Sequence, residues 1–186
     1  DEPELTRDGV FLLAYSLGAN MMLKFLGEKD FPVSILGAAS VSAPIDLAQT
    51  AQRLKARRNR VYNRALLAYL KRDATGNGAK LTESESRAVE EAHDIYQFDE
   101  LFIAPHNGFS GANDYYQKVS ALNFLAEIET PTLVIHAKND PWIPSAAYKN
   151  YDWEANAHLH LLLSKGGGHA GFHAKGGLVP WHDRAT

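Results

Sequence analysis

Cysteine is absent from this chain of 186 residues, so neither disulfide bonds nor thiol chemistry is available to it. This absence neither supports nor excludes secretion. No apolar run approaches the roughly 18 residues that are needed to span a bilayer. Residues 1–4 are mostly acidic, where a signal peptide would be basic and then apolar. We therefore expect a cytoplasmic location, with any membrane anchor lying upstream of these residues.

The chain also lacks an excess of positive charge. Lysine and arginine together number 19 against 22 aspartates and glutamates, and the net charge is -3. Nucleic-acid binders carry a basic surface, so no nucleic-acid partner is expected. With 45% apolar and 22% charged residues, the composition is that of a globular chain able to form one domain with a core.

A run of five apolar residues, 10–14, leads into the pentapeptide from Ala14 to Gly18, and a helix-forming run follows. This order predicts a buried parallel strand, a tight turn and a helix. A nucleophile elbow requires this order, because a serine on a sharp, strained turn stands clear when the residues two positions away are small. Ser16 is therefore a candidate nucleophile. The alternative interpretation is an ordinary turn with a capping serine.

The same patterns extend along the chain and predict an α/β sheet of about four parallel strands with flanking helices. Apolar runs that are rich in β-branched and small residues indicate the strands, and amphipathic runs indicate helices between them. The strands are expected at residues 10–14, 33–41, 131–137 and 158–163, and two of the helices at 18–28 and 145–156.

The segment between the second and third strands breaks this alternation. A basic amphipathic helix is predicted over residues 47–72, and an acidic helix follows from the capping box of Thr82 and Glu85 as far as Tyr96. Residues 100–126 are expected to be mostly loop. Insertions of this length at the active edge of a sheet are typical of a lid. The basic helix is either a solvated face paired with the acidic helix or a surface for anionic membranes.

Polar side chains follow three of the predicted strands. Ser16 follows the first, Asp140 the third, and His169 lies in a glycine-rich loop after the fourth. Because the carboxyl ends of parallel strands form one edge of a sheet, we expect these three side chains to meet there. Their order along the chain, serine, aspartate and then histidine, is that of the α/β hydrolases.

This arrangement assigns a role to each group. His169 accepts the proton of the Ser16 hydroxyl as general base, and Asp140 holds the imidazole in the required tautomer. The backbone N–H of Leu17, at the start of the helix, is the expected donor to the oxyanion. No cofactor or metal is expected to take part.

Two rival interpretations remain open. Asp46 follows the second strand and is an alternative acid, although Asp140 lies in a tighter turn. His169 and His173 have the spacing of a metal-binding pair, but the glycines around them disfavour a helix, and a zinc site would need a third ligand.

Several short runs match one family pattern. They are residues 16–20, 23–28, 41–47, 98–99, 104–105, 108–109, 115–116, 120–121, 131–133, 139–141 and 167–172. With these runs the chain resembles the YheT-like family of α/β hydrolases, whose relatives include abhydrolase-domain lipases and ester synthases. Ala14 and Ala19 stand where the family usually has glycine.

The resemblance carries the triad onto Ser16, Asp140 and His169, and it implies hydrolysis of lipophilic or short- to medium-chain carboxylic esters through an acyl-enzyme. An acyltransferase that uses the same triad is the first alternative, and a non-catalytic binding module with a hydrolase fold is the second. A small-molecule or lipid ester is the expected partner, with a membrane surface as a further candidate.

The resemblance also implies that residues 1–186 form one partial α/β-hydrolase domain, with the lid insertion at about 47–126. The family has further strands before the nucleophile strand and a final helix after the region of Trp181. We therefore expect the missing N-terminal segment to complete the sheet and the oxyanion hole. By itself, the chain is expected to be inactive and to aggregate.

Overall fold

A computed structural model describes residues 8–76, 78, 80–173 and 180. The N-terminal residues 1–4 and Trp181, on which some expectations above rest, lie outside this range. The backbone forms two compact units: one comprises the residues up to Asp46 together with those from Val119 onward, and the other is Leu47–Lys118.

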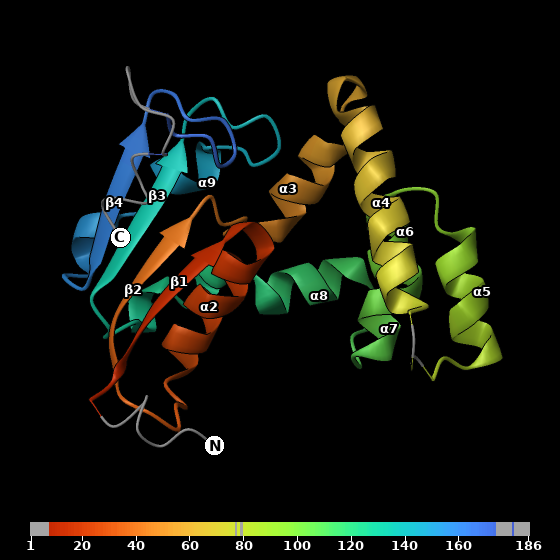
Figure 1. Ribbon diagram of the computed structural model, residues 1–186, viewed down its shortest axis with the longest axis horizontal. Coiled ribbons are helices and arrows are strands. Elements are labelled where there is room, and N and C mark those ends of the chain that lie inside the picture. The colour runs from red at the N-terminus through yellow and green to blue at the C-terminus, as the bar shows by residue number, and fades with distance from the viewer. Residues whose placement is uncertain (1–7, 77, 79, 174–179, 181–186) are drawn as a thin grey trace. The chain divides into compact units, whose positions relative to one another are not determined.

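Four parallel strands form the sheet of the first unit, in the order in which they occur in the chain (Figure 1). They are β1 (Val10–Tyr15), β2 (Ile35–Val41), β3 (Thr132–Ala137) and β4 (Leu159–Ser164). Each strand pairs in parallel with the next, which confirms the predicted fold class. Because all four strands run in one direction, their carboxyl ends share one edge.

Helix α2 (Ser16–Glu28) begins directly where β1 ends. It buries Leu23 and Leu26 completely, and a side chain of this size contributes about 1.5–3 kcal/mol on full burial. The side chain of the buried residue Asn20 has hydrogen-bond partners at both of its polar atoms. Its amide donates to the Val119 carbonyl at 3.1 Å, and its Oδ1 accepts from the N–H of Ala121 at 2.8 Å. These contacts fix α2 on the unit that carries the sheet.

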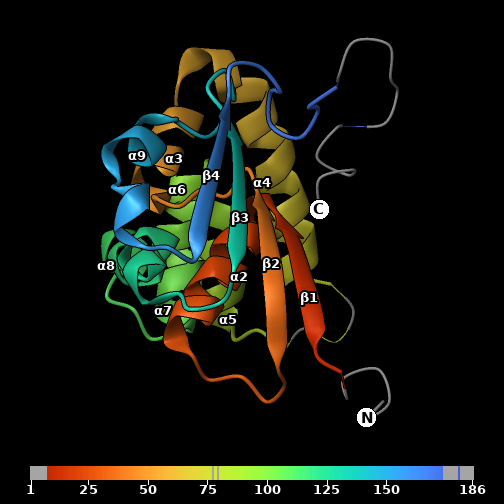
Figure 2. The same ribbon diagram turned by 90° about the vertical axis from the view of Figure 1, so that its left-hand side faces the viewer.

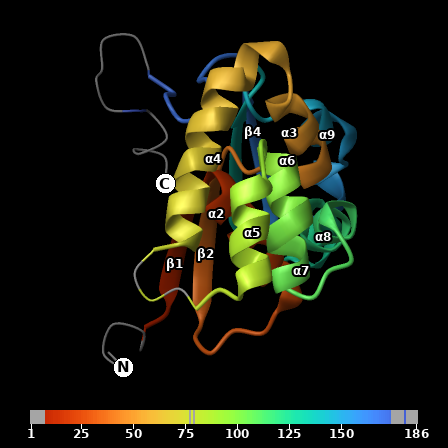
Figure 3. The ribbon, with the colours of Figure 1, turned by 90° about the vertical axis from the view of Figure 1, so that its right-hand side faces the viewer.

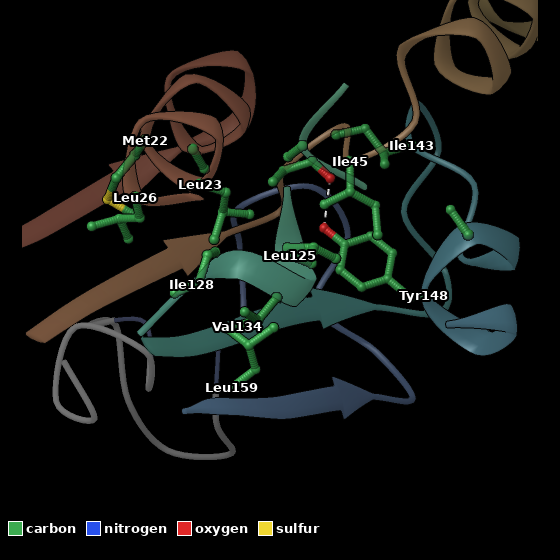
Figure 4. Packing of buried hydrophobic residues seen from close by; sticks show 14 residues of the cluster. Met22, Leu23, Leu26, Ile45, Leu125, Ile128, Val134, Ile143, Tyr148 and Leu159 are labelled. Carbon is green, nitrogen blue, oxygen red and sulfur yellow. Dashed lines mark hydrogen bonds between the residues drawn. The ribbon is translucent and has the colours of Figure 1, made fainter. Parts of the chain in front are cut away.

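The core of this unit lies between α2, one face of the sheet and helix α9 (Ala146–Asn150), as Figure 4 shows. Tyr148 on α9 is fully buried there, and its hydroxyl donates to the Ala43 carbonyl at 2.5 Å. Three short 3-10 turns complete the unit, namely Ala121–Asn123, Leu125–Glu127 and Trp153–Ala155.

The other face of the sheet is apolar; among the described residues it is open along β1, whereas Phe172 packs on Val41, Ile135 and Ala137 at the carboxyl end of β2 and β3. Along β1 every second side chain points to this face, and Phe11, Leu13 and Tyr15 remain 76%, 49% and 39% exposed. Figure 2 shows the strands from this side, in front of α2. A groove of about 510 Å³ lies on this face, between Phe11 on β1 and His160 on β4.

Helices make up the second unit, in which α4, α5 and α6 lie side by side (Figure 3). The elements are α3 (Leu47–Leu54), a 3-10 turn (Arg57–Asn59), α4 (Arg60–Ala74), α5 (Glu83–Glu91), α6 (Ile95–Phe98), a π-helical stretch (Asp99–Ile103), α7 (Ala104–His106) and α8 (Ala112–Val119).

The single helix expected over residues 47–72 is wrong, because the chain turns after Leu54. The Asn59 amide donates to the Arg53 carbonyl at 3.0 Å, and the Asn63 amide donates to the Leu54 carbonyl at 3.1 Å. These two buried side chains satisfy carbonyls that the last turn of a helix leaves without partners. Two helices at an angle therefore replace one.

Three further expectations need correction. Residues 100–126 are largely helical and not loop, and the helix expected over 145–156 ends at Asn150. The capping box of Thr82 and Glu85 is present, but α5 ends at Glu91, so Tyr96 belongs to the next helix. Asp94 causes this restart, because its side chain accepts the N–H of Gln97 at 2.8 Å as the cap of α6.

Across the described part of the chain, every helix is too short or too polar to cross a bilayer.

Candidate active site

Ser16 occupies the turn between β1 and α2 in a left-handed backbone conformation, with φ 51°. A non-glycine residue in this region is strained by about 1 kcal/mol or more. The strain accompanies an abrupt change from extended backbone at Tyr15 to the first turn of α2. A Cβ added at Gly18 would meet no described atom within 4 Å, so contacts of the described residues do not explain the small residue there.

A continuous chain of hydrogen bonds joins the three residues that were expected to meet at the edge of the sheet. The Ser16 Oγ lies 2.9 Å from His169 Nε2, and His169 Nδ1 lies 2.9 Å from Asp140 Oδ2. A carboxylate only accepts, so Nδ1–H donates to Asp140 and Nε2 is left to accept the proton of the serine hydroxyl. All three residues belong to the unit that carries the sheet.

Asp140 is held by its own turn after β3. Its Oδ1 accepts the N–H groups of Trp142 and Ile143 at 2.8 Å and 3.0 Å, so that Oδ2 faces His169. The Asp140 side chain is fully buried, while that of His169 is 15% exposed. The Trp142 ring lies against the imidazole, with 4.7 Å between ring centres.

The loop that carries His169 is fixed from two sides. Asn139 Oδ1 accepts the N–H of Gly168 at 3.0 Å, which links the acid turn to the histidine loop. Phe172 is buried beneath the loop, and a Cβ at Gly167 would come within 2.5 Å of its ring. Gly167 therefore leaves room for Phe172.

Helix α2 points its first turn at the same place. The backbone N–H groups of a first helical turn have no partners within the helix and carry a partial positive charge. No acidic side chain lies in this turn, and Tyr15 makes no side-chain cap. The N–H of Leu17, the first after Ser16, is therefore in a suitable environment for a developing oxyanion.

A neutral histidine lies behind the acid. His136 on β3 is completely buried, and its ring stacks on Tyr148 with 4.1 Å between centres. Burial lowers the pKa of His136 to about 4, and the charge of Asp140 opposes this shift. The imidazole is uncharged at neutral pH, so it adds no positive charge beside Asp140.

Sequence reasoning identified Ser16, Asp140 and His169 but missed the residues that support them. Asn139 carried one signal, its position directly before Asp140 in the turn. Phe172 lies in the run 167–172 that matches the family pattern, but the pattern alone gave it no role. His136 carried no signal, because an isolated histidine in an apolar run is typical of a core. Among the described residues, no three histidine or carboxylate side chains group closely enough to hold a metal ion.

The model of a protein family described as serine aminopeptidase, S33, matches residues 2–174. The chain belongs to this family of α/β hydrolases. An abhydrolase domain-containing protein of Dictyostelium discoideum is 28% identical to this chain over 179 residues, which are 95% of the chain and 45% of the relative.

Two further relatives bear on the resemblance. The putative esterase YheT of Escherichia coli is 32% identical over 163 residues, covering 86% of this chain and 48% of its own, so the chain is YheT-like as expected. A monoacylglycerol lipase of Saccharomyces cerevisiae is 31% identical over 170 residues, covering 87% of this chain and 38% of its own. The chain thus spans less than half the length of these curated relatives.

Proposed function

We propose that the protein containing this chain hydrolyses carboxylic esters through an acyl-enzyme on Ser16. The single observation that carries the proposal is the hydrogen-bond chain from Asp140 through His169 to Ser16, with both distances at 2.9 Å. Membership of a hydrolase family and the similarity to a monoacylglycerol lipase support an ester with an apolar acyl group as the substrate.

The proposed first half-reaction forms one bond and breaks another. Ser16 Oγ attacks the ester carbonyl while His169 Nε2 takes the hydroxyl proton, and the Leu17 N–H donates to the resulting oxyanion. The tetrahedral intermediate collapses, the alkoxide leaves with the proton from His169, and the acyl group remains on Ser16. Asp140 stabilises the imidazolium during both transfers.

In the second half-reaction, water loses a proton to His169 and attacks the acyl-enzyme; the bond between the acyl carbon and Ser16 Oγ then breaks, His169 returns the proton to Ser16 Oγ, and the acid is released. An alcohol in place of water would make the protein an acyltransferase. Both reactions share the acyl-enzyme, so the partition between ester and free acid at rising alcohol concentration decides between them.

We also propose that the Leu47–Lys118 unit acts as the lid. Its insertion in the chain between β2 and β3 supports this role. Lids exclude water and shape the acyl site, so shortening this unit is expected to change the preference for acyl length. A series of p-nitrophenyl esters of increasing acyl length measures that preference.

A fluorophosphonate probe tests the proposed nucleophile in the full-length protein. The probe should label the wild-type protein, and Ser16→Ala should abolish labelling and lower ester turnover roughly 10⁴-fold or more. Ser110→Ala, at an exposed serine, is the matched control and should keep both. Absence of labelling in a folded wild-type sample would favour a non-catalytic binding module.

A further inference from the structure

The helical unit Leu47–Lys118 contains a polar pocket of about 370 Å³. The end of α3, the first turns of α4 and the connection between α5 and α6 surround it; α4, α5 and α6 are visible side by side in Figure 3. Its lining residues are Leu54, Lys55, Arg60, Asn63, Arg64, His93 and Asp94.

Positive charge dominates the lining. Arg60 and Arg64 are one helical turn apart on α4, so their side chains share a face, and Lys55 adds a third cation. Within the described ranges, none of these three side chains forms a salt bridge with a carboxylate. Asp94 is the one carboxylate in the lining, and its Oδ1 is engaged by the N–H of Gln97.

The walls of the pocket are held in place independently of any ligand. Asn63 is buried, donates to the Leu54 carbonyl at 3.1 Å and accepts the N–H of Ile95 at 3.3 Å. The Lys55 ammonium lies 3.7 Å from the centre of the Tyr96 ring. Hydrogen bonds therefore join α3, α4 and α6 around the cavity.

We propose that this pocket binds a phosphate-bearing anion. Three cations against one carboxylate leave a net charge of +2 in the lining, which matches the charge of a phosphomonoester near neutral pH. Guanidinium groups present paired N–H donors that fit phosphate oxygens, and an anion relieves the repulsion between the clustered cations. The pocket volume lies within the usual range of small-ligand sites.

The phosphate has two possible sources, a free phosphorylated molecule and the headgroup of an anionic lipid. Both present the same oxygens to Arg60 and Arg64, so the pocket chemistry is common to them. The proposal concerns this unit alone and is independent of ester hydrolysis by Ser16.

Two double variants of the full-length protein test the pocket. Arg60→Gln with Arg64→Gln removes both guanidinium groups from the lining, whereas Arg72→Gln with Arg87→Gln removes the same charge from residues outside it. Calorimetric titration with inorganic phosphate should show binding by the wild-type protein. The pocket variant should bind at least about tenfold more weakly, because charge-assisted hydrogen bonds are lost. The control should stay within about twofold, because Arg72 and Arg87 lie outside the pocket lining.

Sedimentation with phosphatidylcholine vesicles, with and without phosphatidic acid, separates the two sources. Sedimentation that requires both phosphatidic acid and the two pocket arginines supports the lipid headgroup. Phosphate binding without such sedimentation supports a free ligand. Absence of wild-type binding in both experiments, or equal losses in the two double variants, would overturn the proposal. All of the replaced side chains are exposed, and unchanged thermal unfolding of both variants verifies that they fold.

Discussion

The Nε2 atom of His169 lies 2.9 Å from the Oγ of Ser16, although 153 positions separate the two residues in the sequence. The parallel sheet makes this possible, because β1 and β4 end at the same edge. The contact depends on two loops that are fixed by different means, the strained turn at Ser16 and the glycine run anchored by Asn139.

Two asparagine substitutions test whether Asp140, and not Asp46, is the acid of the proposed triad. Asp140→Asn should lower kcat for ester hydrolysis about 10⁴-fold, because an amide no longer fixes the tautomer of His169 or stabilises its charged form. Asp46→Asn should leave kcat near that of the wild-type protein, since His169 Nδ1 is bonded to Asp140. The opposite pattern in steady-state kinetics would assign the acid role to Asp46.

The meeting of Ser16, Asp140 and His169 was predictable from sequence because each follows an apolar run with the pattern of a buried strand. Ser16, Asp140 and His169 were placed by three such runs and by the rule that strand ends meet at one edge. The sequence did not predict which residues hold these three side chains in place. Asn139 acts through a contact with Gly168, 29 positions away, and Phe172 packs against Gly167. Periodicity carries no information on such contacts.

The helical unit was less predictable for a related reason. The turn after Leu54 contains neither glycine nor proline, the residues that usually mark a helix end. Asn59 and Asn63 end the helix instead by bonding its carbonyls, and in the sequence they are indistinguishable from solvated polar residues. Residues 100–126 show the opposite error: Pro105 and its neighbours suggested a loop, whereas short helices form there.

The buried imidazole at position 136 should make the protein acid-sensitive. Its pKa is about 4 in the folded chain and about 6.5 when unfolded, so the unfolded state binds the proton first as pH falls. Stability is therefore lost as pH falls from 6.5 towards 4, by about 3 kcal/mol of unfolding free energy. His136→Phe keeps the stacking on Tyr148 and should remove this loss.

Denaturant unfolding at several pH values measures the effect as the difference between wild type and variant. The comparison with the variant is needed because Asp99 changes the stability in the opposite direction as pH falls. Burial raises its pKa to about 6, although Tyr116 donates a hydrogen bond to it, so its contribution rises as pH falls from 6 towards 4. A variant that retains the full acid sensitivity of the wild-type protein would contradict the role given to His136.

Two glycines of α2 should respond very differently to alanine. A Cβ at Gly27 would lie 2.5 Å from the Phe124 carbonyl oxygen, so Gly27→Ala forces the backbone apart and should cost about 1–3 kcal/mol. A Cβ at Gly18 would meet no described atom within 4 Å, so Gly18→Ala should be neutral or stabilise the helix by up to about 1 kcal/mol. Thermal unfolding of both variants tests the contrast, and equal destabilisation would contradict it.

The open face of the sheet should bind an apolar dye when the 186-residue chain is studied by itself. Phe11 is 76% exposed there and borders the groove on that face. Phe11→Ser should reduce the fluorescence of bound anilinonaphthalene sulfonate, since contiguous apolar surface binds such dyes. Val61→Ser removes an apolar side chain that is 83% exposed in the helical unit and should leave the signal unchanged. Equal reductions would indicate that the dye does not distinguish the sheet face.

The absence of acidic side chains from the first turn of α2 has a consequence for inhibitor selectivity. A boronic acid becomes a negatively charged tetrahedral adduct when it captures a serine oxygen, whereas an aldehyde adduct can remain neutral. The N-terminal dipole of α2 favours the anion, and neither an aspartate nor a glutamate within that turn weakens its field. The end of this helix is therefore expected to favour inhibitors of the proposed nucleophile Ser16 that become negatively charged after binding.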